Sequence, residues 1–378
     1  MRATAMTAAI SILLFACSTD EMGTDDPGDQ ASGDLADLQA RASGQYIVTL
    51  RDQNATGTQW VEAHGVVAER VFDHSVRGCV LRGSADMAEA LRSDPTVASV
   101  EQDMVITLED SVADADSEVS ADAAQITPPG ITRVGGSSIT NGRFAYVIDT
   151  GIDFDNDDLF VVKPLSRNFV KTEPNRGEDL NGHGTHVAGI IAAKDNDIDV
   201  VGVVASTPVV AVRVLSSSGG GLASDAIAGV DYVASVARAG DVANMSLSTP
   251  VRVAALDQAV LRAANRGILF ALSAGNDAVD AATASPAGVN HPNVFTVSAI
   301  GTDNCLANFS NFGASVDFAA PGVGVRSLAI GGGTVSFNGT SQAAPHVAGL
   351  LIATRGRLRT DGFACRDRDA RPDPIAHR

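Results

Sequence analysis

The fold is decided by the stretch Asn338-Gly339-Thr340-Ser341-Gln342-Ala343-Ala344-Pro345-His346-Val347-Ala348-Gly349, in which a glycine-bearing turn leads into an apolar helix. Ala343, Val347 and Leu350 recur at the spacing of one buried helical face. Pro345 falls near the first turn, where a missing N–H costs least. Ser341 therefore stands at a helix N-terminus, among unpaired backbone N–H groups. A serine there is either a helix cap or a nucleophile, and the rest of the sequence has to decide between the two roles.

The composition indicates a large folded core. The chain has 378 residues, enough for one large domain or two to three smaller ones. Hydrophobic residues make up 45% of the chain and charged residues 19%, and Gly, Ala and Val are abundant, which favours helices packed tightly on a buried sheet. The formal net charge of −18 argues against nucleic acid as a partner, because phosphates require a basic surface.

The first 17 residues predict export. They contain a short apolar run, Ala8 to Ala16, which is too short to span a bilayer and is typical of a secretory signal. Leu14-Phe15-Ala16-Cys17 also resembles a bacterial lipobox, in which Cys17 would carry a lipid and supply the protein's only membrane contact. The alternative is an ordinary signal cleaved near Ala16. The prediction is a secreted protein or an outer-surface lipoprotein.

Three segments precede the main domain. Residues 18–44 are rich in Asp, Gly, Ala and Ser and predict a solvated linker. Residues 45–108 predict a compact unit whose elements follow the order β-α-β-β-α-β, the ferredoxin-like split βαβ pattern, with a last strand at 104–108. Residues 109–124 contain six acidic residues and no basic one, which is typical of an exposed, cleavable connector.

Residues 125–354 alternate between apolar strands and amphipathic helices. Such alternation predicts an α/β fold, with a parallel sheet covered on both faces by helices. The predicted strands are 144–152, 209–215, 242–247, 268–272 and 294–300, and the predicted helices are 182–193, 224–240 and 253–266.

Polar side chains stand where these strands end or where a helix begins. Asp149 lies at the carboxyl end of an apolar strand, the end at which open parallel sheets bind ligands. His183 opens a helix of small residues, and Asn276 comes just after another strand. With Ser341 they supply what acyl transfer needs: a nucleophile, a base, an acid that orients the base, and an amide that stabilises an oxyanion.

These motifs make the chain similar to the subtilisin-like (subtilase) serine endopeptidases, in particular to their proteinase K branch. The order Asp, His, Ser is the order of that family. The resemblance implies that Asp149 orients the His183 ring and that His183 acts first as general base and then as general acid. It also implies that Ser341 is the nucleophile and that Asn276 completes the oxyanion hole. It implies a subtilisin-like fold and no cofactor for catalysis.

The resemblance also implies how a peptide substrate is held. The family pairs substrate backbone with a Ser-Leu-Gly edge, which here reads Ser246-Leu247-Ser248, and with a second edge that matches Gly219, Gly220 and Gly221. A peptide would then bind as an added strand. The unit 45–108 resembles the family's inhibitory propeptide, so the protein's own propeptide is an expected partner beside protein or peptide substrates.

The sequence contains two candidate metal sites, and each also has a structural explanation. Pro292, Val294 and Asp317 match a family calcium site made of two carbonyls and one carboxylate, an oxygen-only set that suits Ca²⁺, although Asp317 is equally well explained as a turn residue. His183 and His186 are a weak metal pair, because the Glu of the zinc-hydrolase motif is absent between them, and His186 is expected to be a packed helix residue. His346 is likewise expected to be buried and structural.

The C-terminal residues 355–378 have seven Arg, four Asp and almost no apolar run. This composition predicts disorder, from a frameshifted or truncated reading frame or from a natural polar tail. Of the four cysteines, Cys305 and Cys365 remain to pair if Cys17 is lipidated and Cys79 belongs to a removed segment.

The sequence therefore predicts a secreted serine endopeptidase, made as a zymogen, with a peptidase domain at 125–354. The alternative is an inactive relative that binds peptides or has a structural role. The presence of Asp149, His183, Ser341 and Asn276 favours the enzyme.

Overall fold

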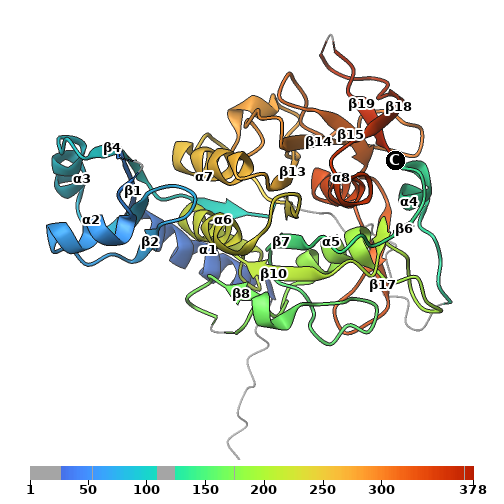
Figure 1. The fold of residues 1–378 in the computed structure, drawn as a ribbon, viewed down its shortest axis with the longest axis horizontal. Coiled ribbons are helices and arrows are strands. Elements are labelled where there is room, and N and C mark those ends of the chain that lie inside the picture. The colour runs from blue at the N-terminus through green and yellow to red at the C-terminus, as the bar shows by residue number, and fades with distance from the viewer. Residues whose placement is uncertain (1–26, 53, 109–123, 174, 370) are drawn as a thin grey trace, which may run out of the picture.

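A computed structural model of the chain describes residues 27–52, 54–108, 124–173, 175–369 and 371–378. The signal-like residues 1–17 and nearly all of the acidic connector lie outside the described residues. Figure 1 shows a large unit built around a sheet and a smaller N-terminal unit, drawn in blue, beside it.

The large unit has a nine-stranded sheet in the order β18-β19-β15-β14-β13-β12-β7-β10-β8. Neighbouring strands are parallel from β19 to β8, and only β18 is antiparallel to its neighbour. The strands are β7 (Ala145–Asp149), β8 (Arg167–Asn168), β10 (Val209–Arg213), β12 (Val242–Met245), β13 (Leu269–Ser273), β14 (Val294–Ile300), β15 (Phe318–Pro321), β18 (Arg359–Phe363) and β19 (Pro374–His377).

Helices cover both faces of this sheet, as the alternation predicts. Val147 and Ile148, which are neighbours on β7, point to opposite faces and belong to two separate apolar cores. The first core contains side chains of helices α5 (His183–Ala192) and α8 (Thr340–Thr354), and the second contains those of α6 (Ala223–Val236) and α7 (Ala254–Asn265). The predicted α/β fold is thus confirmed.

Short elements complete the large unit. They are α4 (Pro129–Arg133), the parallel pair β6 (Ser138–Ile139) and β9 (Val204–Ala205), the 3₁₀ turns at Lys163–Leu165 and Ala281–Thr283, and the hairpin of β16 (Val325–Leu328) and β17 (Thr334–Phe337). In the described part of the chain, no helix is both long and apolar enough to cross a membrane.

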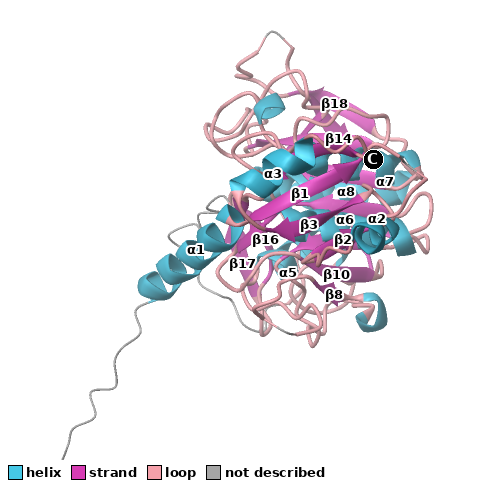
Figure 2. Ribbon diagram, turned by 90° about the vertical axis from the view of Figure 1, so that its left-hand side faces the viewer, coloured by secondary structure: helices cyan, strands magenta, loops and turns pink. Residues whose placement is uncertain are grey.

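The N-terminal unit has the predicted β-α-β-β-α-β order. Its antiparallel sheet runs β2-β3-β1-β4, and its own apolar core includes Val48 and Trp60. Figure 2 views the molecule from this side. The elements are β1 (Gln45–Leu50), α2 (Gly57–His64), β2 (Arg70–Phe72), β3 (Gly78–Arg82), α3 (Ala85–Arg92) and β4 (Val97–Gln102).

The last strand predicted for this unit does not join its sheet. Strand β5 (Val105–Thr107) crosses to the large unit and pairs in antiparallel register with β11 (Gly220–Leu222). The prediction that this strand closes the N-terminal unit is therefore wrong. Its partner β11 lies in the large unit, and a local sequence pattern cannot reveal so distant a partner.

The predicted linker at 18–44 also needs correction, because helix α1 occupies Pro27–Ser43. Its composition gives little apolar periodicity, but Leu38 and Ala42, four residues apart, bury one face against Leu222 and Val105. Tertiary contact, rather than intrinsic propensity, accounts for helix formation here.

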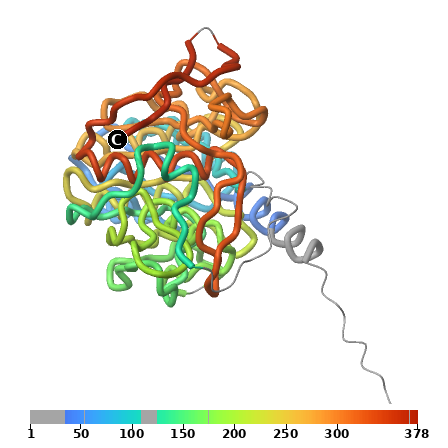
Figure 3. Tube along the Cα trace, turned by 90° about the vertical axis from the view of Figure 1, so that its right-hand side faces the viewer, coloured from blue at the N-terminus to red at the C-terminus, as the bar shows by residue number. Residues whose placement is uncertain are grey.

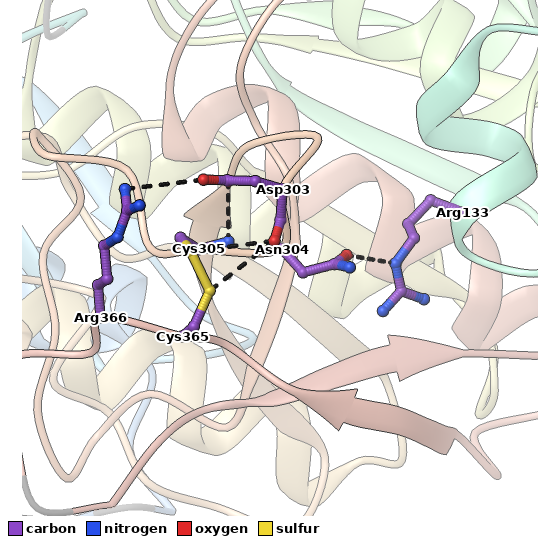
Figure 4. The surroundings of a disulfide bond; sticks show 6 residues. All are labelled: Arg133, Asp303, Asn304, Cys305, Cys365 and Arg366. Atoms are coloured by element: carbon purple, nitrogen blue, oxygen red, sulfur yellow. Dashed lines mark hydrogen bonds and ion pairs between the residues drawn. A yellow bond between two sulfur atoms is a disulfide. The ribbon is translucent and has the colours of Figure 1, made fainter.

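The described residues of the tail at 355–378 are folded, so the predicted disorder is wrong, and the argument for a frameshifted or truncated frame loses the disorder on which it rests. Strands β18 and β19 form a ribbon at the sheet edge, drawn in red in Figure 3, and β19 docks in parallel on β15. Ile375 is buried, and Asp373 accepts a hydrogen bond from Ser298 Oγ. Figure 4 shows the disulfide between Cys305 and Cys365 that ties this ribbon to the loop after β14. The disulfide and the pairing of β19 with β15 stabilise this segment, although its sequence has almost no apolar run.

Candidate active site

Asp149 and His183 meet at the carboxyl edge of the sheet. Asp149 ends β7, and its Oδ1 lies 2.8 Å from His183 Nδ1 and accepts the Thr150 N–H at 2.7 Å. His183 opens α5 and is buried with Asp149. Gly184 lets α5 approach this closely, since a Cβ there would lie 2.1 Å from the Gly151 carbonyl oxygen.

The protonation of His183 is set by two opposing effects. Burial opposes the charged form, but the charge of Asp149 and its hydrogen bond to the ring outweigh burial and raise the pKa of His183 above its ordinary value of 6.5. The same hydrogen bond fixes the ring so that Nε2 is available as an acceptor when the imidazole is neutral.

Ser341 lies in the first turn of α8 and is hydrogen-bonded to Ser246, the residue that follows β12. Its Oγ donates to the Ser246 carbonyl at 3.2 Å, while Ser246 Oγ donates to the Ser341 carbonyl at 2.7 Å. His183 Nε2 lies 3.5 Å from the Nε2 of Gln342, the residue after the serine. The serine and the imidazole are thus brought to one place, with the hydroxyl turned toward Ser246.

Asn276 follows β13 and is oriented by Thr340. Its Oδ1 accepts the Thr340 N–H at 2.8 Å and the Thr340 hydroxyl at 3.0 Å. The amide nitrogen therefore faces the turn before the serine, and a Cβ built on Gly339 would lie 3.3 Å from it. This is the orientation in which an amide donates to charge developing beside Ser341.

The two expected substrate edges flank one extended segment, which is part of the chain itself. On one side, β11 pairs with β5, and the Leu108 N–H donates to the Gly219 carbonyl at 2.9 Å. On the other side, Thr107 forms an antiparallel bridge with Ser248. Ser248 forms this bridge although it stands in place of the family's glycine. Ser246, Leu247 and Ser248 are all buried.

The side chain of Ile106 anchors this segment. It is fully buried and belongs to the core that contains Leu215 and Ala223 of the large unit. Sequence reasoning did not identify Ile106, although its apolar character beside the acidic connector was a signal that could have done so.

His186 and His346 are structural, as expected. His186 Nε2 lies 3.0 Å from the Val325 carbonyl, and burial lowers its pKa to about 3. His346 Nδ1 lies 2.9 Å from the Gln342 carbonyl, and burial lowers its pKa to about 4. The His186 ring packs against the β16–β17 hairpin and the His346 ring lies beside Gly130, so the described residues give the metal-pair alternative no support.

The residues of the expected calcium site lie beside β14. Pro292 precedes the strand, Val294 opens it, and Asp317 comes immediately before the neighbouring β15. Asp317 Oδ2 accepts the Thr296 N–H at 2.9 Å, and burial raises the pKa of this carboxyl to about 6. The described residues contain no group of three or more His, Cys, Asp or Glu suited to a metal.

A second oxygen-rich site was missed by sequence reasoning. Asp158 is buried with its Oδ2 unpartnered, and burial raises its pKa to about 7. Its Oδ1 accepts from Asn196 Nδ2 at 2.7 Å. The Gln125 amide lies nearby and donates to the Lys194 carbonyl at 2.8 Å. The contributing loops are far apart in sequence, so no local motif marks the site.

Comparisons with known proteins agree with this geometry. Residues 141–357 match the family model described as the subtilase family. The chain is 39% identical over 299 residues to alkaline serine exoprotease A of Vibrio alginolyticus, covering 76% of this chain and 53% of that protein. It is 36% identical over 324 residues to alkaline serine protease ver112 of Corniculantispora psalliotae, covering 82% and 79%.

Two further likenesses extend the comparison. The chain is 36% identical over 343 residues to M-protease of Shouchella clausii (strain KSM-K16), covering 86% of this chain and 84% of that protein. The crystal structure of a cold adapted subtilisin-like serine proteinase superimposes with a TM-score of 0.55 and 34% identity, covering 64% of this chain and 91% of that one. The chain thus spans about half the length of the Vibrio relative and most of the length of the others.

Proposed function

Because the chain belongs to the subtilase family of serine peptidases, we propose that it is an exported endopeptidase, made as a zymogen, that cuts peptide bonds with Asp149, His183 and Ser341. The observation that carries the proposal is the position of residues 105–108, which lie as an added strand between the edges 219–221 and 246–248. An extended peptide is therefore already accommodated where a substrate would bind.

The chemistry follows from the positions of these side chains. Ser341 Oγ turns from the Ser246 carbonyl and attacks the substrate carbonyl carbon, while His183 Nε2 takes the hydroxyl proton. His183 then gives that proton to the leaving amine, and water releases the acyl group by the reverse proton transfers. Asp149 holds the ring and stabilises the imidazolium, and Asn276 donates to the oxyanion.

Contacts between the two units support the zymogen. Glu101 accepts the first N–H groups of α7, at 2.8 Å from Ala254 and 3.2 Å from Ala255. Asp103 accepts the Ser224 N–H near the start of α6 at 3.1 Å. Carboxylates at helix N-termini meet unpaired donors and the positive end of the helix dipole. The N-terminal unit is thus complementary to the peptidase surface, as an internal inhibitor requires.

The proposed activity is tested with the processed protein and an unfolded protein substrate. Mass spectrometry of the products should show cleavage at internal bonds, which identifies an endopeptidase. Release of terminal residues alone, or no cleavage at all, would contradict the proposal.

Asn276→Ala is expected to lower kcat by about 10²–10³-fold with little change in KM, because the amide meets charge mainly in the transition state. Steady-state kinetics on a peptide substrate measures both constants. A rise in KM at constant kcat would instead assign Asn276 to binding of the ground state.

The pH profile should reflect the raised pKa of His183. Only neutral His183 acts as a base, so kcat/KM should rise with pH through an acid limb whose midpoint lies above 6.5. Titration of the His183 ring by NMR in the Ser341→Ala protein, after active wild-type protein has removed its N-terminal unit in trans, gives the same pKa without turnover. A midpoint below 6 in both measurements would contradict the Asp149–His183 coupling.

We also propose structural calcium, with two candidate oxygen sets. The set at Pro292, Val294 and Asp317 has a carboxylate oxygen already bound to Thr296, whereas Asp158 presents a buried oxygen with no partner. The oxygens around Asp158, which include those of Gln125, Lys194 and Asn196, therefore fit a cation better. Calcium would neutralise that buried carboxylate and link the loops around it.

Calcium should raise the melting temperature of the processed protein, and a chelator should reverse the increase. Asp158→Asn is expected to remove most of this calcium-dependent increase, with Asp317→Asn as the matched control. Loss of the increase in the Asp317 variant alone would place the ion at that set, and a melting temperature independent of calcium would contradict both.

A further inference from the structure

Helix α1 precedes the inhibitory unit yet lies against the peptidase's substrate edge. Leu38 and Ala42 share one face of α1, and both are buried with Leu222, the last residue of β11. Val105 of β5 packs against the same cluster. One apolar face of α1 thus contacts both strands of the β5–β11 pair.

Gly220 makes the contact close. A Cβ built on Gly220 would lie 2.6 Å from Leu38 Cδ1, so Leu38 rests on the bare backbone of the substrate edge. Gly220 pairs with Thr107 in the sheet register. The helix therefore covers the place where the chain's own extended segment is bound. Figure 2 shows α1 extending away from the body of the molecule.

The charges near α1 are also complementary. Asp225, on α6 of the peptidase unit, is buried and forms an ion pair with Arg70 of the N-terminal unit. Burial raises the pKa of Asp225 to about 6, and the positive charges of Arg70 and Arg41 oppose that rise. Arg41 of α1 therefore lies close enough to the peptidase unit to interact with one of its buried carboxylates.

We propose that α1 is a second inhibitory contact, a helical clamp that packs on β11 and holds β5 in the substrate groove. The proposal rests on the proposed zymogen function and extends the inhibitory segment to begin at Pro27 rather than at Gln45. Release of activity then requires the loss of two contacts: that of the N-terminal unit with α6 and α7, and that of α1 with the substrate edge.

The test uses the full chain with Leu38→Asp, and Leu35→Asp as the matched control. Both leucines lie on α1, but Leu38 is 6% exposed and Leu35 is 39% exposed. Placing a charge at Leu38 removes the buried apolar contact, which should shorten the delay before peptidase activity appears by about tenfold or more. The Leu35 variant should keep the wild-type delay. Equal delays in all three proteins, or equal shortening in both variants, would overturn the clamp.

Hydrogen exchange separates this proposal from the proposed function. In the full chain made inactive by Ser341→Ala, Leu38→Asp should speed amide exchange in β11 and β5 while β1 and β3 stay protected. If no variant has peptidase activity but this difference is present, the zymogen function fails and the contact stands. Loss of protection throughout residues 45–107 would assign α1 to folding of the N-terminal unit and overturn the clamp.

Discussion

Replacing Ser341 by alanine is expected to lower kcat by roughly 10⁶-fold, a magnitude established for subtilisin, and to leave the full-length chain uncut. Ser246 is not expected to replace the nucleophile, because its hydroxyl donates to the Ser341 carbonyl. Residues 105–108 would then remain between the substrate edges. The measurement is kcat on a peptide substrate, together with the mass of the purified chain over time.

Adding active wild-type protein to the Ser341→Ala precursor provides the control. Cutting in trans at the normal site would show that the variant is folded and lacks only its nucleophile. Maturation of the variant at the wild-type rate, with no other protease present, would contradict self-processing.

Replacing Cys305 and Cys365 together by serine should lower the free energy of unfolding by roughly 2–4 kcal/mol. The bond closes a loop with a sequence separation of 60 residues, so its loss increases the entropy of the unfolded chain. It also releases the ribbon β18–β19, whose strand β18 is exposed along its whole length.

Denaturant unfolding of the processed protein measures this effect. Phe363→Ala on β18 is the control, since Phe363 is 67% exposed and its loss should change stability by less than about 0.5 kcal/mol. A double serine variant as stable as the wild type would mean that the disulfide contributes nothing to the stability of the fold.

Residues that follow apolar strands directly could be predicted from the sequence. Asp149 and Asn276 stand at or just after β7 and β13, and parallel strands bring their carboxyl ends to one edge. His183 and Ser341 open helices that pack together on one face of the same sheet. Strand period, helix period and their alternation predicted where these residues lie, and the resemblance to the family supplied their roles.

Features that depend on partners far apart in sequence could not be predicted. Helix α1 has few apolar residues and is stabilised by its contact with Leu222. The ribbon β18–β19 has an Arg/Asp-rich sequence and is held by a disulfide and by docking on β15. Strand β5 pairs with β11, more than a hundred residues later in the chain. For α1 and the ribbon, local composition gave the wrong answer because tertiary contact overrode it, whereas for β5 the local pattern predicted the strand but not its partner.

Labelling of the processed protein with a fluorophosphonate tests the central claim most directly, because the probe reacts with a serine that is activated as a nucleophile. We expect about one label per molecule, found on the peptide that contains Ser341, and none on the Ser341→Ala protein. The uncut precursor should label far more slowly, because residues 105–108 lie between the substrate edges. An unlabelled processed protein, or a label on another serine, would contradict the account.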